Sequence, residues 1–147
     1  MTGAPFDLQA MGLLLHQGRR LHAVSMGLAG LAGLWLVLGA VAGISLGAPV
    51  QALLIASLLA AALQLYCAMR TDFDAGLFQA VAALPPADAM RILDASLQSL
   101  GLQPVDRAGR SWDARWRGAR TWLRRQGLLA GAQLLLMAGA WLAALAR

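Results

Sequence analysis

One long uncharged stretch dominates the pattern of hydrophobic and polar positions. Between Arg20 and Arg70 the sequence contains no Asp, Glu, Lys or Arg, and most positions are apolar. A water-soluble domain needs charged side chains on its surface, so a run of this length is not expected in one. Its length suits two membrane-crossing helices joined by a tight turn at 47–49. The sequence therefore predicts a transmembrane helical hairpin over residues 24–69.

Both predicted spans of this hairpin, 24–46 and 50–69, contain rows of small residues at helical spacing. A rotation of about 100° per residue brings such rows onto one side of a helix. Helices in lipid associate by close van der Waals contact, which small side chains allow. We therefore expect the two rows to face each other, although a pore lining or a flexible gate is an alternative interpretation. The predicted helix-packing residues of the hairpin are Gly33, Gly39, Gly43, Gly47, Ala52, Ala56 and Ala60.

Two further segments flank the hairpin and the charged region that follows it. Residues 127–147 form a third apolar stretch of transmembrane length, in which Gly127 and Gly131 are spaced for helix packing. Residues 1–23 predict an amphipathic lead-in helix that lies on the membrane surface or continues into the first span. A cleaved signal peptide is the disfavoured alternative, because the apolar stretch is longer than the roughly 7–15 residues of a signal peptide.

Residues 70–126 contain most of the charge, and their apolar positions predict amphipathic helices rather than a span. Asp72 is a candidate cap for a helix that ends at Pro85, and a second helix is expected from Pro86 to Gly101. A hairpin of about thirty residues cannot bury a core of its own, so its apolar faces must rest on the membrane, the lead-in helix or a partner. The predicted partner-binding residues are Phe73, Leu77, Met90, Leu93 and Leu97.

A third helix of this region is expected from Ser111 and combines tryptophans on one side with arginines on another. This pattern is typical of a helix lying among lipid headgroups. An acidic protein and a nucleic acid are alternative partners, and the adjoining third span argues against nucleic acid. The predicted membrane-surface residues are Trp112, Trp116, Arg117, Arg120 and Arg124.

Composition and charge add a location and an orientation. Hydrophobic residues make up 59% of the chain and charged residues 13%, which favours lipid as the main solvent. All twelve basic residues are Arg, while Lys, Glu and Asn are absent, as expected for a GC-rich bacterial genome. Eleven of the twelve arginines precede the first span or lie between spans two and three. Because positive residues favour the cytoplasmic side, the N-terminus and residues 70–126 are predicted to be cytoplasmic and the C-terminus periplasmic, in a bacterial inner membrane.

The sequence predicts no catalytic, cofactor or metal site. It contains no nucleophile elbow, phosphate loop or metal-spaced Cys/His cluster. Asp72 and Asp74 form a pair that helix capping explains, with a metal or acid–base role as the alternative. His16 and His22 are six residues apart and diverge on a helix, so haem or metal ligation would need another subunit.

These expectations combine into an all-α integral membrane protein with three transmembrane helices and a cytoplasmic helical segment between spans two and three. We expect a non-catalytic accessory or scaffolding subunit that binds another integral membrane protein, or copies of itself, in a bilayer with anionic headgroups and without nucleic acid. The alternative from another class is a small homo-oligomeric channel or transporter for an apolar or uncharged substrate. The absence of charge inside the spans disfavours that alternative.

Overall fold

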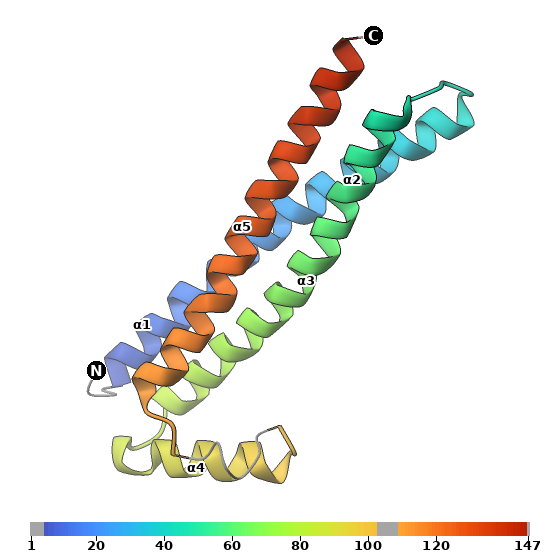
Figure 1. Ribbon diagram of the computed structural model, residues 1–147. Coiled ribbons are helices and arrows are strands. Elements are labelled where there is room, and N and C mark those ends of the chain that lie inside the picture. Colours follow the sequence, from blue (N-terminus) through green and yellow to red (C-terminus); the bar gives the residue numbers. More distant parts are fainter. Residues whose placement is uncertain (1–4, 103–108, 147) are drawn as a thin grey trace. The chain divides into compact units, whose positions relative to one another are not determined.

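The computed structural model describes residues 5–102 and 109–146, which are helical with short connections and contain no strand (Figure 1). The helices are α1 (Pro5–His16), α2 (Gly18–Val41), α3 (Ala48–Ala82), α4 (Pro86–Ser99) and α5 (Trp112–Leu145). The chain forms two compact units. Unit 1 comprises Met1–Gln17 and Arg70–Trp122, and unit 2 comprises Gly18–Met69 and Leu123–Arg147.

Three helical stretches are long and apolar enough to cross a bilayer, which fits a multi-pass membrane protein. They are α2 with the adjoining part of α1, α3 and α5. The 35 residues of α3 and the 34 residues of α5 extend for about 50 Å at roughly 1.5 Å per residue. This length exceeds the roughly 30 Å thickness of the hydrocarbon core of a bilayer.

The helix boundaries differ from the expected ones at two places in the charged region. We expected a new helix to begin near Asp72 and the third span to begin near Gly127, yet α3 and α5 each pass through these positions without a break. Thr71, next to the expected cap, is 1% exposed, so packing holds this turn in the helix. Favourable packing outweighs the tendency of an aspartate to begin a helix.

The end of the first span also differs, because the expectation of a helix through Leu46 is wrong. Helix α2 ends at Val41. The amide of Gly43 donates to the Ala40 carbonyl at 3.3 Å, and the amide of Ile44 donates to the Gly39 carbonyl at 3.0 Å. Gly43 has a φ of +66°, so these two bonds form a glycine-terminated helix end. Gly43 and Gly47 therefore lie in the connection to α3 and not on a helix.

Unit 2 packs α2 against the first part of α3 and the second part of α5. The buried positions of α5 recur at alternating steps of three and four residues, as in coiled-coil packing. The rings of Trp35 and Trp141 lie 5.0 Å apart between centroids. Leucines, valines and isoleucines cover much of the outer surface. The core of the unit contains Ala32, Val50, Leu54, Met137 and Ala140.

Unit 1 contains α1, the end of α3, α4 and the beginning of α5. In Figure 1, α4 lies crosswise at the ends of α3 and α5. Gly101 follows α4 with a φ of +67°, and the amide of Leu102 donates to the Leu97 carbonyl, so the expected glycine stop is confirmed. A Cβ at Gly12 of α1 would lie 2.8 Å from Cγ of Gln79, so a larger residue here would displace the Gln79 side chain of α3. The apolar side chains of α1 that are buried in this unit are Leu8, Met11 and Leu15.

Candidate functional site

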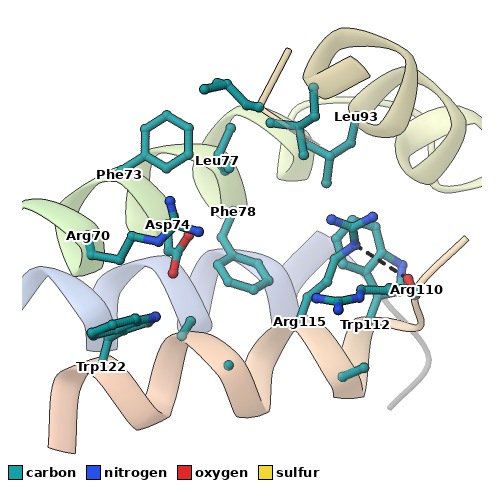
Figure 2. A pocket seen from close by; sticks show the side chains of 15 residues that line it. Arg70, Phe73, Asp74, Leu77, Phe78, Leu93, Arg110, Trp112, Arg115 and Trp122 are labelled. Atoms are coloured by element: carbon teal, nitrogen blue, oxygen red, sulfur yellow. Dashed lines mark hydrogen bonds between the residues drawn. The ribbon is translucent and has the colours of Figure 1, made fainter. Parts of the chain in front are cut away.

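Unit 1 contains a cleft of about 230 Å³ between α3, α4 and the beginning of α5 (Figure 2). Most of its lining residues are apolar, and charged side chains lie at both ends of the group that Figure 2 draws. The apolar residues on the α3 and α4 sides are Phe73, Leu77, Phe78, Leu93 and Leu97. The charged lining residues are Arg70, Asp74, Arg110 and Arg115.

Helical spacing brings the wall residues onto shared faces. Arg70, Asp74 and Leu77 follow one another at steps of four and three along α3, and Leu93 and Leu97 are four apart on α4. The ring of Phe78 lies 6.4 Å from that of Trp112 and 6.3 Å from that of Trp116, between centroids. These aromatic contacts attach the first turns of α5 to the end of α3.

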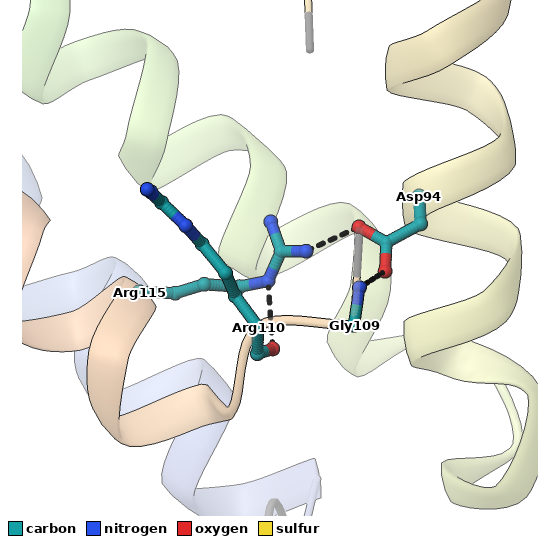
Figure 3. Close-up of polar contacts among 4 residues, drawn as sticks. All are labelled: Asp94, Gly109, Arg110 and Arg115. Atoms are coloured by element: carbon teal, nitrogen blue, oxygen red, sulfur yellow. Dashed lines mark hydrogen bonds and ion pairs between the residues drawn. The ribbon is translucent and has the colours of Figure 1, made fainter. Parts of the chain in front are cut away.

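A charged pair fixes the start of α5 against α4 (Figure 3). A guanidinium nitrogen of Arg115 donates to Oδ1 of Asp94, and the Gly109 amide donates to Oδ2 of the same carboxylate at 2.8 Å. The side chains of Arg115 and Asp94 are only 13% and 12% exposed. Nε of Arg115 also donates to the Arg110 carbonyl at 3.4 Å. Arg115 therefore positions the backbone from which the Arg110 side chain extends.

The charges of the cleft are predominantly positive, with three arginines and one aspartate among its lining residues. Arg70 and Arg110 are exposed, whereas Asp74 is half-buried. Asp74 lies five residues beyond the uncharged part of α3. Burial raises its pKa above the ordinary value of 3.8, while the Arg70 charge acts in the opposite direction. The arrangement suits a ligand that presents both apolar surface and negative charge.

The cleft brings together residues from two of the predicted groups. Of the five predicted partner-binding residues, all but Met90 line it. Among the predicted membrane-surface residues, Trp112 lines the cleft, and Trp116 packs on Phe78 without lining it. Arg117, Arg120 and Arg124 are exposed on α5 outside the cleft. Whether these groups bind a partner or a membrane surface stays a prediction.

The predicted helix-packing residues take varied positions in unit 2. Gly39 is buried, and a Cβ added at this position would lie 2.7 Å from Cγ of Leu46. Ala60 is also buried, whereas Ala52 is exposed. A Cβ at Gly33 or at Gly131 would have no heavy atom within 4 Å, apart from its immediate surroundings in the chain. The half-buried members of the group are Gly33, Gly47, Ala56, Gly127 and Gly131.

A cluster of buried polar side chains links the helices of unit 2, and it was not predicted from the sequence. The Ser25 hydroxyl donates to Oε1 of Gln133 at 2.6 Å, and Nε2 of Gln133 donates to the Ser25 carbonyl at 3.0 Å. Nε2 of Gln126 donates to the Gly18 carbonyl at 2.6 Å. The side chains of Gln126 and Gln133 are fully buried. The sequence signal that could have indicated this cluster is the spacing of Gln126 and Gln133, which lie seven residues apart and so on the same side of an apolar helix.

Gln64 of α3 belongs to the same cluster and is also fully buried. Its Oε1 lies 3.2 Å from Nδ1 of His22, so α2 and α3 share a polar contact. Three buried polar atoms of the cluster have no hydrogen-bond partner within the described residues: Ser57 Oγ, Gln64 Nε2 and Gln126 Oε1.

The histidines and carboxylates do not form a metal cluster within the described part of the chain. Nδ1 of His16 lies 3.5 Å from Oδ1 of Asp72, in unit 1. His22 lies in unit 2 beside Gln64. The two histidines thus have separate neighbours, each with a local polar contact.

Comparison with known proteins provides no relative from which a role could be inferred. The chain matches no protein-family model, no curated protein and no solved structure at a significant level.

Proposed function

We propose that this protein is a non-catalytic accessory or scaffolding subunit of the bacterial inner membrane, which binds another integral membrane protein through small-residue helix faces and through unit 1. The main support comes from α2. Gly27 and Gly30 are exposed, and a Cβ at either position would have no heavy atom within 4 Å beyond its surroundings in the helix. They lie on the side of α2 opposite to the buried residues Ser25 and Ala32.

An exposed glycine pair is informative in a helix that crosses lipid. Glycine offers no side chain for contact with lipid and lowers helix stability by about 1 kcal/mol relative to alanine. It does allow the backbone of another helix to approach closely, which is a main source of helix association in membranes. The exposed face of α2 formed by Gly27 and Gly30 is therefore suited to close contact with a helix of another chain.

The proposed orientation follows from the arginines. Their concentration before α2 and between α3 and α5 favours a cytoplasmic unit 1 and a periplasmic C-terminus. Arg124, three residues before the predicted third span, then extends toward anionic headgroups from the exposed side of α5. Reporter fusions after residues 102 and 146 test this orientation, and a periplasmic signal from the first fusion would contradict it.

The glycine face is tested by the double variant Gly27→Leu/Gly30→Leu. The variant and the natural chain are purified from native membranes in mild detergent, and the proteins that accompany each are quantified. We expect the natural chain to retain a different membrane protein in stoichiometric amount, and the variant to lose at least tenfold of it because two leucines prevent close approach. The matched control is Ala62→Leu/Ala138→Leu, which enlarges two exposed positions on α3 and α5 and should retain the partner.

A partner retained by the glycine variant, or lost equally from the control, would contradict the proposed contact.

The second candidate, a homo-oligomeric channel or transporter, is favoured by the unpartnered polar atoms of Ser57, Gln64 and Gln126 inside unit 2. Polar groups facing a bundle interior are typical of pathways through membranes. Purification of a closed ring of this chain alone would support that candidate and exclude the accessory role.

A further inference from the structure

The cleft of unit 1 has an arginine at each end of its apolar lining residues, and Asp74 lies beside the arginine at one of these ends. In Figure 2, Arg70 lies at one end and Arg110 at the other, with Phe73, Leu77 and Phe78 between them. We propose that this cleft binds an acidic amphipathic helix of the partner protein, whose apolar side fills the cleft and whose carboxylates meet the two arginines. This inference rests on the proposed function and specifies the chemistry of the partner.

The position of the cleft along the helices argues against a membrane lipid as its occupant. Arg70 directly follows the uncharged part of α3, but Trp112 precedes Gly127 by fifteen residues of α5. Fifteen residues of one continuous helix correspond to about 22 Å at roughly 1.5 Å per residue. A headgroup layer is only about 5–8 Å thick. A lipid that reached Arg110 would have to leave the bilayer, whereas a helix that emerges from the membrane beside α3 and α5 would not.

The size of the cleft also favours part of a larger molecule. Its volume of about 230 Å³ is below the roughly 300–1,000 Å³ of sites that enclose a small ligand. A helix that lies in a groove inserts only the few apolar side chains of one face. Phe73, Leu77 and Leu97 provide apolar surface for such a face.

The length of α3 from Arg70 to the contact of Phe78 with Trp112 guides the choice of spacing for the acidic residues. Arg70 is eight residues from Phe78 on α3, and Phe78 contacts Trp112, two residues after Arg110. Eight residues of helix correspond to roughly 12 Å. A ligand helix would therefore present acidic residues seven or eight positions apart, with apolar residues three or four positions from each.

The ion pair of Asp94 and Arg115 leaves one of the three cleft arginines unavailable to a ligand. The Arg115 guanidinium is occupied by Asp94 and by the Arg110 carbonyl. Arg110 is exposed and, within the described residues, its guanidinium makes no ion pair with a carboxylate. Arg115 is thus a positioning residue, and Arg110 is available for an acidic group of the partner.

The test uses the full chain in nanodiscs of neutral phosphatidylcholine and a fluorescent, alanine-rich helical peptide. The peptide carries two Glu seven positions apart with Leu between them, and a second peptide replaces both Glu by Gln. We expect the Glu peptide to bind at least tenfold more tightly than the Gln peptide. The variant Arg70→Glu/Arg110→Glu should lose this preference and bind a third peptide, with Lys in place of Glu, more tightly than the natural chain does.

The matched control is Arg117→Glu/Arg120→Glu, which changes the net charge equally on the exposed side of α5 outside the cleft. It should bind the Glu peptide within about threefold of the natural chain. Circular dichroism and a monodisperse size-exclusion profile establish that all variants fold.

Three results would overturn the proposal. The first is equal binding of the Glu and Gln peptides, and the second is an equal loss of binding in the control variant. The third is that phosphatidylglycerol displaces the Glu peptide from the natural chain and does not bind the variant Arg70→Glu/Arg110→Glu. The last result would identify a lipid site. A partner that co-purifies from native membranes while the Glu peptide fails to bind would overturn only this inference, and a missing partner would overturn the accessory role itself.

Discussion

The two units satisfy their buried polar groups by different means. Unit 2 joins its helices through neutral amides and hydroxyls, as in the paired hydrogen bonds of Ser25 and Gln133. Unit 1 joins α4 to α5 through the ion pair of Asp94 and Arg115. The difference follows from the expected solvent, because an ionised side chain inside lipid is costly whereas an ion pair near water retains partial solvation.

The outer surfaces show the same contrast. In unit 2, side chains as large as Leu59 and Leu135 are 64% and 75% exposed, which is acceptable for helices in lipid. In unit 1, Leu13 and Leu100 are also exposed, at 63% and 69%, but the arginines Arg117 and Arg120 of α5 are exposed as well. A single pair of helices, α3 and α5, thus carries two surface chemistries along its length. One continuous helix can therefore suit lipid along one part and water along another, when its sequence changes from uncharged to charged.

The largest effect is expected from removing the ion pair of unit 1. Asp94→Ala leaves the Arg115 guanidinium and the Gly109 amide without this carboxylate, and we expect a loss of about 2–3 kcal/mol in the local stability of unit 1. Hydrogen exchange of α4 amides measures this loss. Asp94→Asn keeps an acceptor for Gly109 and should lose less. Equal loss of protection in α2 would contradict the separation of the two units.

A smaller effect is expected from the neutral contact in unit 2. Ser25→Ala and Gln133→Leu each leave a polar group without its partner, while the double variant removes both groups. We expect each single variant to lower the free energy of unfolding by about 1 kcal/mol, with a coupling of roughly 0.6–1.7 kcal/mol. Reversible unfolding in lipid bicelles measures the four proteins of this cycle. Strictly additive effects would show that the hydrogen bonds contribute no stability.

The smallest effect is expected from Asp74 and concerns pH. A carboxyl group whose pKa is raised by folding binds its proton more tightly in the folded state, so it favours folding at low pH. This contribution is lost as the pH rises from 3.8 through the raised pKa and stays absent at neutral pH. Asp74→Asn should therefore raise the thermal stability of unit 1 slightly at neutral pH and flatten its dependence on pH in that window. Lower stability of the variant at neutral pH would show that attraction to Arg70 outweighs the cost of burial.

Local sequence signals accounted for the number of apolar helices and for some of their ends. The uncharged run between Arg20 and Arg70 was sufficient to indicate two helices of transmembrane length, because charge is excluded from lipid. Gly101 was a reliable stop, since few other residues adopt its positive φ. The apolar spacing of Phe73, Leu77 and Leu97 also identified most of the wall of the cleft, although not the charges at its ends.

What the sequence determined by itself was the all-helical class and the division into apolar and charged stretches, because both depend on neighbouring residues. Tertiary structure alone decided which small residues are buried, where α3 continues past Arg70, and which polar groups meet. Ser25 and Gln133 are separated by 108 positions, and Asp94 and Arg115 by 21. Helical periodicity describes one helix at a time, so pairs that belong to different helices are specified only when the whole bundle packs.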